Sequence, residues 1–403
     1  MNLISFLIWI GILLKGHDTN SDLDFLDVVL WDKDPDFLRN VTELISSKGY
    51  PVENHFVETE DGYILSVQRI PSGRKKWNGL KQVVFLQHGL LASATDWVLN
   101  FPEQSLAFIL ADAGYDVWLG NIRGNTYSRR HVKYSPNSEE FWQFSFDEMA
   151  KYDLPAMIDL ALNVTGQKQL YYIGHSQGTT AAFALLSESP EYNKKIKLYI
   201  ALAPVATVGY ITSGIRHLAP YVADVNFLFH ILGVSEFLPS TPVMKFLSET
   251  LCDTEAKFIC EHIIFLLVGT DYSQLNATRL GVYVSHTPAG ASTQSIIHYA
   301  QMVNAKVFQK YDFGKKGNLL HYKQPTPPQY YVENITTNVA LFSSKNDKLA
   351  DDKDVTLLEG KLKSCVSSTC VKLPQFNHLD FVWGIDANTL VYEEVQILMK
   401  KYS

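Results

Sequence analysis

The chain has 403 residues, a formal net charge of −7 and a sequence pI near 5.9. Hydrophobic residues make up 46% of it and charged residues 19%, a composition that is typical of a folded protein and argues against a disordered one. The negative net charge disfavours a nucleic-acid partner, because it repels phosphate groups.

An apolar run opens the chain, from Leu3 to Leu14, and polar residues follow from Lys15. Because a helix needs about 20 apolar residues to cross a bilayer, this run is too short for a transmembrane anchor. We therefore predict a cleaved signal peptide over residues 1–19, in preference to a retained anchor, and entry into the secretory pathway.

Glycosylation acceptors and cysteine spacing agree with export. The N-x-[ST] acceptors begin at Asn40, Asn163, Asn276 and Asn334. The four cysteines form two close pairs, Cys252 with Cys260 and Cys365 with Cys370. Such spacing favours short-loop disulfides in an oxidising compartment, and buried or idle thiols are the alternative.

Strand-like and helix-like segments alternate along the first half of the chain. Residues 52–71 predict a hairpin around Asp61-Gly62. Further strands are expected at 83–86, 116–119, 170–173 and 198–202. Helices are expected at 105–113, 153–164 and 179–187. This alternation predicts an α/β protein whose sheet is mostly parallel, with the hairpin at its edge.

The alternation stops after Ala203-Pro204. From about residue 206 to residue 329 the sequence has apolar helical stretches, notably 227–238 and 258–268, and these are interrupted by prolines. We interpret residues 206–329 as a mainly helical cap and lid inserted over the ligand-binding edge of the sheet.

The strand pattern returns near the end of the chain. Strands are expected at 339–343 and 370–373, and a helix at 390–400. We therefore expect the α/β core to consist of two parts, residues 20–205 and 330–403.

Residues 174–178 read Gly-His-Ser-Gln-Gly and match G-x-S-x-G. In this pattern a serine stands on a strained turn between a strand and a helix, and the glycines let the backbone pass closely. The motif directly follows the expected strand at 170–173. We therefore predict that Ser176 is a nucleophile, with a plain tight turn as the alternative.

A serine hydroxyl needs a base within hydrogen-bond reach, and the base needs a third group that orients it. His378 is the expected base, because it follows the expected strand at 370–373 and gives the chain order serine, acid, histidine. His175 adjoins the serine, and we expect it to pack beside the turn.

Asp347 is the expected acid, since it lies in the first loop after the expected strand at 339–343. Three neighbouring carboxylates are Asp351, Asp352 and Asp354. They lie where a helix would begin, so capping or first-turn roles explain them. Asp380 follows His378 too closely in the sequence to orient it easily.

Backbone N–H groups are the expected stabilisers of the oxyanion in ester cleavage. One would come from Gln177, the residue after the nucleophile, and the other from Leu90 in the loop after an early strand. An ordinary turn is the alternative for this loop. The sequence has no metal-ligand, phosphate-loop or dinucleotide pattern, so we expect no metal and no cofactor.

The chain resembles the acid lipase family, which includes gastric and lysosomal acid lipases, from about Leu38 to its end. The residues that carry the resemblance lie in long blocks, at 85–93, 110–121, 144–155, 174–179 and 377–381. The resemblance implies an α/β-hydrolase fold with Ser176, Asp347 and His378 as the triad and Leu90 and Gln177 as oxyanion donors.

The resemblance also implies a substrate class and a location. Members of the family hydrolyse neutral lipid esters, triacylglycerol or cholesteryl ester, at a lipid–water interface and at acidic pH. They are secreted or lysosomal, and a Cys252–Cys260 bridge fits their cap. A general esterase for small soluble esters and a catalytically silent lipid carrier are the alternatives, and the intact triad argues against the carrier.

Two features depart from the family pattern. The loop at 343–351 lacks the usual glycines before Asn346 and the usual tryptophan after Asp347, which implies a stiffer loop and a more basic rim. Cys365 and Cys370 have no evident counterpart in the family, so their bridge rests on spacing alone.

Overall fold

The computed structural model describes residues 34–75, 77, 79, 81–222, 229, 233–239 and 257–403. The predicted signal peptide at 1–19, Cys252 and part of the expected helix at 227–238 (227–228 and 230–232) lie outside these residues.

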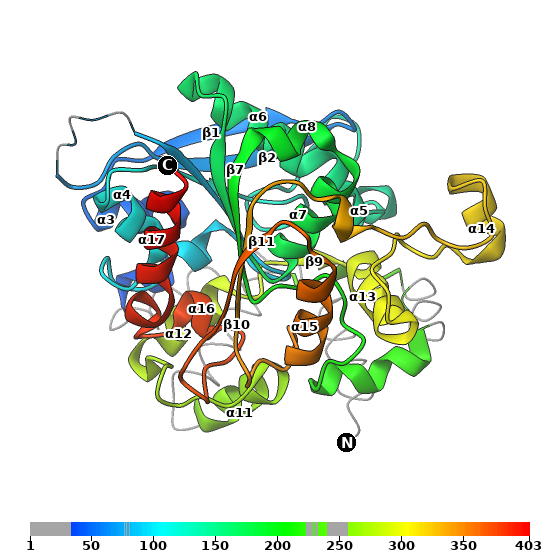
Figure 1. Ribbon diagram of the computed structural model, residues 1–403. Coiled ribbons are helices and arrows are strands. Elements are labelled where there is room, and N and C mark those ends of the chain that lie inside the picture. The colour runs from blue at the N-terminus through cyan, green and yellow to red at the C-terminus, as the bar shows by residue number, and fades with distance from the viewer. Residues whose placement is uncertain are drawn as a thin grey trace.

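In the described part of the chain, nine strands form one twisted sheet through the centre of the molecule (Figure 1). Along the sheet the order is β1 (Glu53–Glu58), β2 (Tyr63–Ile70), β4 (Asp116–Gly120), β3 (Val83–Gln87), β6 (Leu170–His175), β7 (Ile196–Leu202), β10 (Val339–Ser343) and β11 (Cys365–Cys370). The short strand β5 (Arg130–His131) pairs with β2. From β4 to β11 all pairings are parallel, whereas β1, β2 and β4 pair antiparallel. The predicted α/β class and edge hairpin are therefore confirmed.

The central strands are buried on both faces because helices cover both sides of the sheet. Every residue of β3, β4, β6 and β10 is buried, as their continuous apolar runs predict. Helices α4 (Leu106–Asp112) and α17 (Glu393–Lys401) lie on one side in Figure 1, and α7 (Gln177–Glu188) lies on the other. Helix α6 (Leu154–Thr165) packs on β1 and β3.

A long, mainly helical segment separates β7 from β10, two neighbouring strands of the sheet. Its described elements are η5 (Gly214–Tyr221), β8 (Glu236–Phe237), α11 (Lys257–Val268), η6 (Ala277–Arg279), α12 (Leu280–His286), β9 (Ala291–Ser292), α13 (Thr293–Ala305), α14 (Gly314–His321) and η7 (Val332–Asn334). Strands β8 and β9 pair with each other and not with the central sheet. The topology is therefore that of an insertion, and the boundaries at 206 and 329 stay a prediction.

One expected strand and one expected helix differ in part from the structure. The last strand is β11 at Cys365–Cys370, not 370–373. It is a polar edge strand, so its position depends on pairing with β10 and leaves little trace in hydrophobicity. Glu236 and Phe237, at the end of the expected helix 227–238, form strand β8.

Cys365 and Cys370 are free thiols, which is the alternative to a disulfide that their spacing left open. They are the first and last residues of β11, and five steps along a strand separate two residues by roughly 16 Å. A disulfide needs Cα atoms within about 7 Å. Cys365 pairs with Val339 and Cys370 with Ser343, so the two cysteines lie beside opposite ends of β10. Cys260 is disulfide-bonded, and its predicted partner lies outside the described residues.

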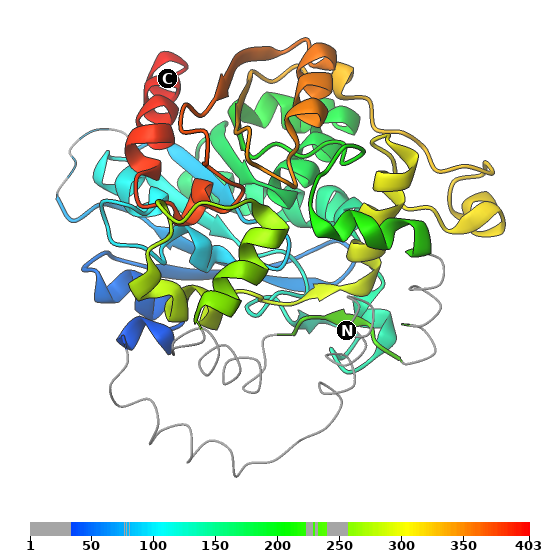
Figure 2. The same cartoon turned by 90° about the horizontal axis from the view of Figure 1, so that it is seen from below.

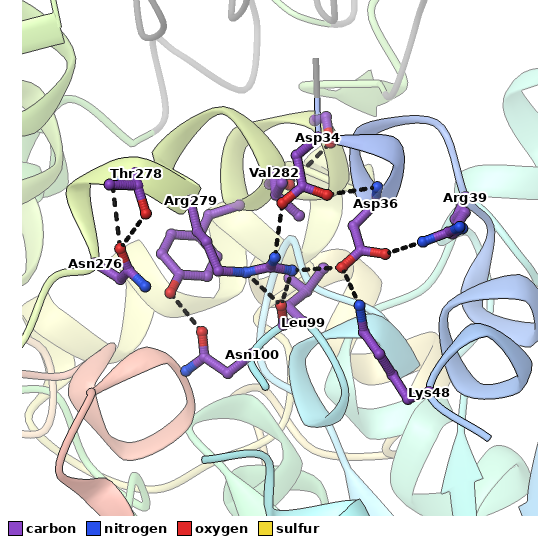
Figure 3. A network of polar contacts seen from close by, with 12 residues as sticks. Asp34, Asp36, Arg39, Lys48, Leu99, Asn100, Asn276, Thr278, Arg279 and Val282 are labelled. Atoms are coloured by element: carbon purple, nitrogen blue, oxygen red, sulfur yellow. Dashed lines mark hydrogen bonds and ion pairs between the residues drawn. The ribbon is translucent and has the colours of Figure 1, made fainter. Parts of the chain in front are cut away.

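A buried network of charges joins the inserted segment to the beginning of the described chain (Figure 3). Arg279 donates to Asp34 and Asp36, each at 2.9 Å, and also to the Leu99 carbonyl. Asp36 is fully buried and also accepts from Arg39 and Lys48. Burial raises the pKa of the Asp36 carboxyl, but the hydrogen bonds from its three cationic partners outweigh burial and lower the pKa to about 2. Figure 2 shows the backbone around this network, where α12 packs against η1 (Pro35–Phe37).

Among the described residues, the helices are all too short or too polar to cross a bilayer.

Candidate active site

Ser176 occupies the turn between β6 and α7, with φ 51° and ψ −117°. Few residues with a side chain adopt this backbone conformation, and such strain concentrates at functional sites. The two glycines of the motif permit close packing around the turn. A Cβ atom on Gly178 would lie 2.4 Å from the Gln87 carbonyl oxygen, and one on Gly174 would lie 2.8 Å from the backbone of Gly178. The local sequence therefore holds the Ser176 side chain at the carboxyl end of the sheet.

Ser176, His378 and Asp347 lie in one hydrogen-bonded chain. His378 Nε2 is 2.8 Å from Ser176 Oγ, and His378 Nδ1 is 2.8 Å from Asp347 Oδ2. His378 and Asp347 are 3% and 2% exposed, whereas Ser176 is partly exposed. The structure thus brings together the three side chains predicted to act together, although they come from three separate loops of the sheet.

The second oxygen of Asp347 also has partners. Asp347 Oδ1 accepts from the backbone N–H groups of Leu349 and Ala350, both at 2.8 Å. These bonds fix the carboxylate so that its other oxygen faces the imidazole. Lys348 in the same loop donates to the Phe265 carbonyl in α11, so its ammonium group is bound to a helix of the inserted segment.

The rival residues have other tasks. Asp351 caps α15 (Asp352–Lys361) by accepting from the Lys353 N–H. Asp354 is buried and accepts from Thr207 and Tyr210. These carboxylates stabilise local structure, and the geometry leaves Asp347 as the partner of the histidine.

His175 packs beside the turn, and its hydrogen bond adds information that sequence reasoning missed. Its Nε2 lies 2.9 Å from the His378 carbonyl oxygen, and the two rings are 4.9 Å apart. Burial lowers the pKa of His175 to about 3, with a smaller contribution from His378, so the ring is neutral and can donate from Nε2. His175 therefore positions the backbone of His378.

The backbone N–H groups of Leu90 and Gln177 both belong to segments that border Ser176. Gly89 lies against the Ser176 Cβ atom, and Gln177 is the first residue of α7. Within the described part of the chain, neither N–H donates to a protein acceptor. The two groups are thus free to bind an oxyanion beside Ser176.

His88 supports the Leu90 loop, a role that the sequence did not reveal. Its Nδ1 lies 2.8 Å from the Gly89 carbonyl oxygen, and its Nε2 contacts the Ile122 N–H and the Asn125 amide. Burial lowers the pKa of His88 to about 4, so the ring stays neutral and Nε2 can accept both bonds.

The four glycosylation acceptors lie at different degrees of exposure. Asn40, Asn163 and Asn334 are exposed, and Asn276 is partly buried. Modification of these side chains stays a prediction. No cluster of three or more metal-ligating side chains occurs among the residues that the structure describes.

Comparison with protein families and known proteins agrees with this geometry. A model described as a partial alpha/beta-hydrolase lipase region matches residues 41–101, and a model of the alpha/beta hydrolase fold matches residues 82–385. The chain is 50% identical to gastric triacylglycerol lipase of Bos taurus over 372 residues, 91% of this chain and 92% of the relative. It is 47% identical to lysosomal acid lipase/cholesteryl ester hydrolase of Homo sapiens over 373 residues, 92% of each chain.

Solved structures agree on the fold. A putative lipase from Sulfolobus solfataricus matches with a TM-score of 0.57 at 15% identity, covering 87% of this chain and 99% of that one. A putative lipase from Acinetobacter baumannii matches with a TM-score of 0.53 at 15% identity, covering 92% and 98%. Together with the matches at close to half identity, these comparisons show that the chain belongs to the acid lipase family of α/β-hydrolases and is a carboxylic ester hydrolase.

Proposed function

We propose that this chain hydrolyses neutral lipid esters, triacylglycerol or cholesteryl ester, through a Ser176–His378–Asp347 triad and an acyl-enzyme intermediate, and that it works at acidic pH. The observation that carries the proposal is the continuous hydrogen-bonded chain from Ser176 Oγ through the imidazole to Asp347.

The first half of the reaction transfers the acyl group to the serine. Ser176 Oγ attacks the ester carbonyl carbon while its proton passes to His378 Nε2. The carbonyl oxygen becomes an oxyanion, which the N–H groups of Leu90 and Gln177 stabilise. When the tetrahedral intermediate collapses, the carbon–oxygen bond to the alcohol breaks, and His378 returns the proton to the leaving alkoxide.

The second half releases the fatty acid. Water gives a proton to His378 Nε2 and attacks the acyl carbon, and the Ser176–acyl bond breaks as the imidazole returns that proton to Ser176 Oγ. Asp347 remains ionised throughout, holds the Nδ1–H group and stabilises the imidazolium that forms in each half.

An apolar face on the inserted segment supports a lipid substrate. Phe258 and Leu266 are 59% and 58% exposed, and the exposed Ile263 lies one turn before Leu266 on α11. The spacing of Phe258 and Leu266, two helical turns, places both on one face. Contact with a lipid surface would remove this face from water, at about 25 cal/mol per Å² of buried apolar area. The names of the gastric and lysosomal relatives point to the same substrates.

Buried carboxyls support operation at acidic pH. Burial raises the pKa of Asp96 to about 7 and the pKa of Asp147 to about 6. These groups are neutral at low pH and become buried charges as the pH rises, so the fold favours acidic conditions. Such conditions suit a protein of the secretory pathway that is secreted into an acidic fluid or delivered to lysosomes.

An activity panel tests the proposal. Emulsified triolein, cholesteryl oleate in vesicles and soluble p-nitrophenyl butyrate would be assayed from about pH 4 to about pH 8, with Ser176→Ala as the control. We expect turnover of at least one long-chain lipid, highest below neutrality and absent in Ser176→Ala. Turnover of the soluble ester alone would instead identify a general esterase.

A further inference from the structure

The segment after α11 crosses directly over the loop that carries His378. We call residues 268–274 the strap and residues 375–380 the histidine loop. The His378 N–H contacts the Val268 carbonyl at 3.5 Å, and Asn377 Nδ2 donates to the Gly269 carbonyl at 3.1 Å. Gly269 has φ 114°, and a Cβ atom there would lie 2.1 Å from the Asn346 carbonyl oxygen. The inserted segment and the catalytic histidine are thus held in direct contact.

Two buried carboxyls meet at this crossing. Asp271 in the strap is 2% exposed, and Asp380 in the histidine loop is 4% exposed. Asp380 Oδ2 accepts from the Asn377 N–H at 2.6 Å, and the neighbouring Asp271 carboxyl is one of the groups that raise the pKa of Asp380. Both groups are acceptors when ionised, so a hydrogen bond between them requires a proton on one of them.

One oxygen of the Asp271 carboxyl is hydrogen-bonded, and the other has no donor among the residues described. Asp271 Oδ1 accepts from the Ser273 N–H at 2.9 Å and from Ser273 Oγ at 2.6 Å. Asp271 Oδ2 is buried, and no donor reaches it from the described residues. An unsatisfied buried carboxylate oxygen is costly, and the protonated carboxyl of Asp380 is the group placed to satisfy it.

The surrounding charges also favour a shared proton. Asp347, in the loop after β10, adds a negative charge near Asp380. Asp96, on η2 (Ala94–Trp97), faces Trp383 at the far end of α16 (Asp380–Trp383). Lys348 approaches from the same loop as Asp347, but its ammonium group bonds to Phe265. Within the described residues, no lysine or arginine pairs with either carboxyl, and His378 is engaged by Asp347 and Ser176.

We propose that Asp271 and Asp380 share one proton, and that the resulting carboxyl–carboxylate hydrogen bond clamps the strap onto the histidine loop and positions His378. The proposal rests on the function proposed above, in which His378 is the base. Burial, followed by the nearby carboxylates Asp271 and Asp347, raises the pKa of Asp380 to about 8. When the proton leaves to solvent, two buried negative charges face each other, and the strap is pushed away from the loop. Asp271 and Asp380 are therefore positioning residues that restrict activity to pH values at which the proton is retained.

Replacement of the shared proton by an amide tests the clamp. In Asp380→Asn, the amide N–H donates to Asp271 at every pH, and the amide oxygen still accepts from Asn377. We expect kcat/KM for soluble p-nitrophenyl butyrate to fall in the wild type as the pH rises through about 8. In Asp380→Asn this alkaline limb moves up by at least about one pH unit, because the amide at position 380 has no proton to lose in this pH range. Asp352→Asn, an exposed residue with the same change of charge, should keep the wild-type limb.

Asp380→Ala tests whether the hydrogen bonds of the Asp380 side chain position His378. It removes the donor and the acceptor together, so we expect kcat to fall by at least about tenfold at acidic pH while Asp380→Asn retains it. An alkaline limb that is the same in the wild type and Asp380→Asn would overturn the proposal, as would an Asp380→Ala protein with wild-type kcat and pH profile.

A second readout keeps this test separate from the proposed function. The thermal midpoint of Ser176→Ala protein, which has no turnover, would be measured against pH with and without Asp380→Asn. The clamp predicts a fall toward alkaline pH that Asp380→Asn makes shallower, whatever the substrate is. Identical curves would refute the shared proton, whereas a wild type that hydrolyses none of the esters would refute only the proposed function.

Discussion

At the residue scale, the site depends on a few close contacts made by short polar side chains. The serine turn has one backbone shape, and a glycine on either side is required because backbone atoms approach to within 2.4–2.8 Å of where a Cβ would be. Asp347 uses one oxygen for two backbone donors and the other for His378. Each group therefore has one orientation in which all its hydrogen bonds are satisfied, which is the preorganisation that catalysis needs.

Asp347→Asn tests the role of the acid. The amide keeps the shape of the carboxylate but can turn an N–H toward the ring, which stabilises the wrong tautomer and no longer stabilises the imidazolium. We expect kcat to fall by about 10⁴-fold with little change in thermal stability. The measurement is kcat on a soluble ester together with the thermal midpoint. A loss of less than about tenfold would assign the acid to another residue.

Part of the site could be predicted from residues alone and part could not. Ser176 stands in a continuous motif, and His378 and Asp347 follow expected strands in a fixed chain order, so local patterns point to them. His88, His175 and the Asp271–Asp380 pair have no such pattern. Asp271 and Asp380 are more than 100 positions apart and meet only because the strap crosses the histidine loop.

At the element scale, burial decides which segments a sequence reveals. The central strands β3, β6 and β10 are buried on both faces, and their apolar runs predict them closely. Strand β11 is an edge strand of serines, threonine and cysteines with a half-exposed pattern. Its position is set by hydrogen bonds to β10, so hydrophobicity placed it several residues too late. The spacing of its two cysteines left open a disulfide that an extended strand cannot form.

The apolar face of α11 provides a prediction for the inserted segment. Leu266→Ser removes an exposed apolar side chain that would contact lipid, while the triad stays intact. We expect turnover of emulsified triolein to fall about threefold to tenfold and turnover of p-nitrophenyl butyrate to stay within about twofold of the wild type. Leu320→Ser, the same substitution at a leucine on α14 that is 74% exposed, serves as the matched control. Equal losses on both substrates would show that α11 acts through the fold.

The buried arginine of the inserted segment provides a second prediction at this scale. Arg279→Leu leaves Asp34 and the Leu99 carbonyl without their cationic partner and removes one of the three cations around Asp36. Because the charges are buried, we expect the free energy of unfolding to fall by about 3 kcal/mol. Denaturant unfolding measures it, with the exposed Arg74→Leu as the control. A change below about 0.5 kcal/mol would mean that the network is not stabilising.

At the scale of the whole molecule, buried titratable groups set the pH range of the fold. Burial raises the pKa of Asp96 to about 7, and burial together with nearby carboxylates raises that of Asp380 to about 8. The stability from their neutral forms is complete below the ordinary carboxyl pKa and is lost as the pH rises through these values. Burial lowers the pKa of both His88 and His298 to about 4, so their contribution is lost as the pH falls below about 6.5.

These opposite signs predict the shape of the stability curve. From about pH 7.5 to about pH 8 the buried histidines are almost entirely neutral in both states, so the buried carboxyls dominate the change in stability. We expect the thermal midpoint to fall across this interval and to fall less in Asp380→Asn. Scanning calorimetry at matched ionic strength measures it. A midpoint that rises from about pH 7.5 to about pH 8 would show that the carboxyls are ionised in the folded protein.

The α/β class was predictable at this scale because alternating strands and helices leave few possible topologies. The arrangement of the inserted segment was not, since its contacts with the first helical turns and the histidine loop join residues that are far apart in the sequence. Those contacts, through Arg279 and the strap, join the inserted segment to the first helical turns and to the histidine loop.

The most direct test of the central claim is the mass of the chain after reaction with a fluorophosphonate. A triad built on Ser176 predicts one adduct per chain, located on Ser176, with labelling at least about 100-fold slower in His378→Ala. An adduct on another residue, or labelling of Ser176 at the wild-type rate without the imidazole, would contradict the account.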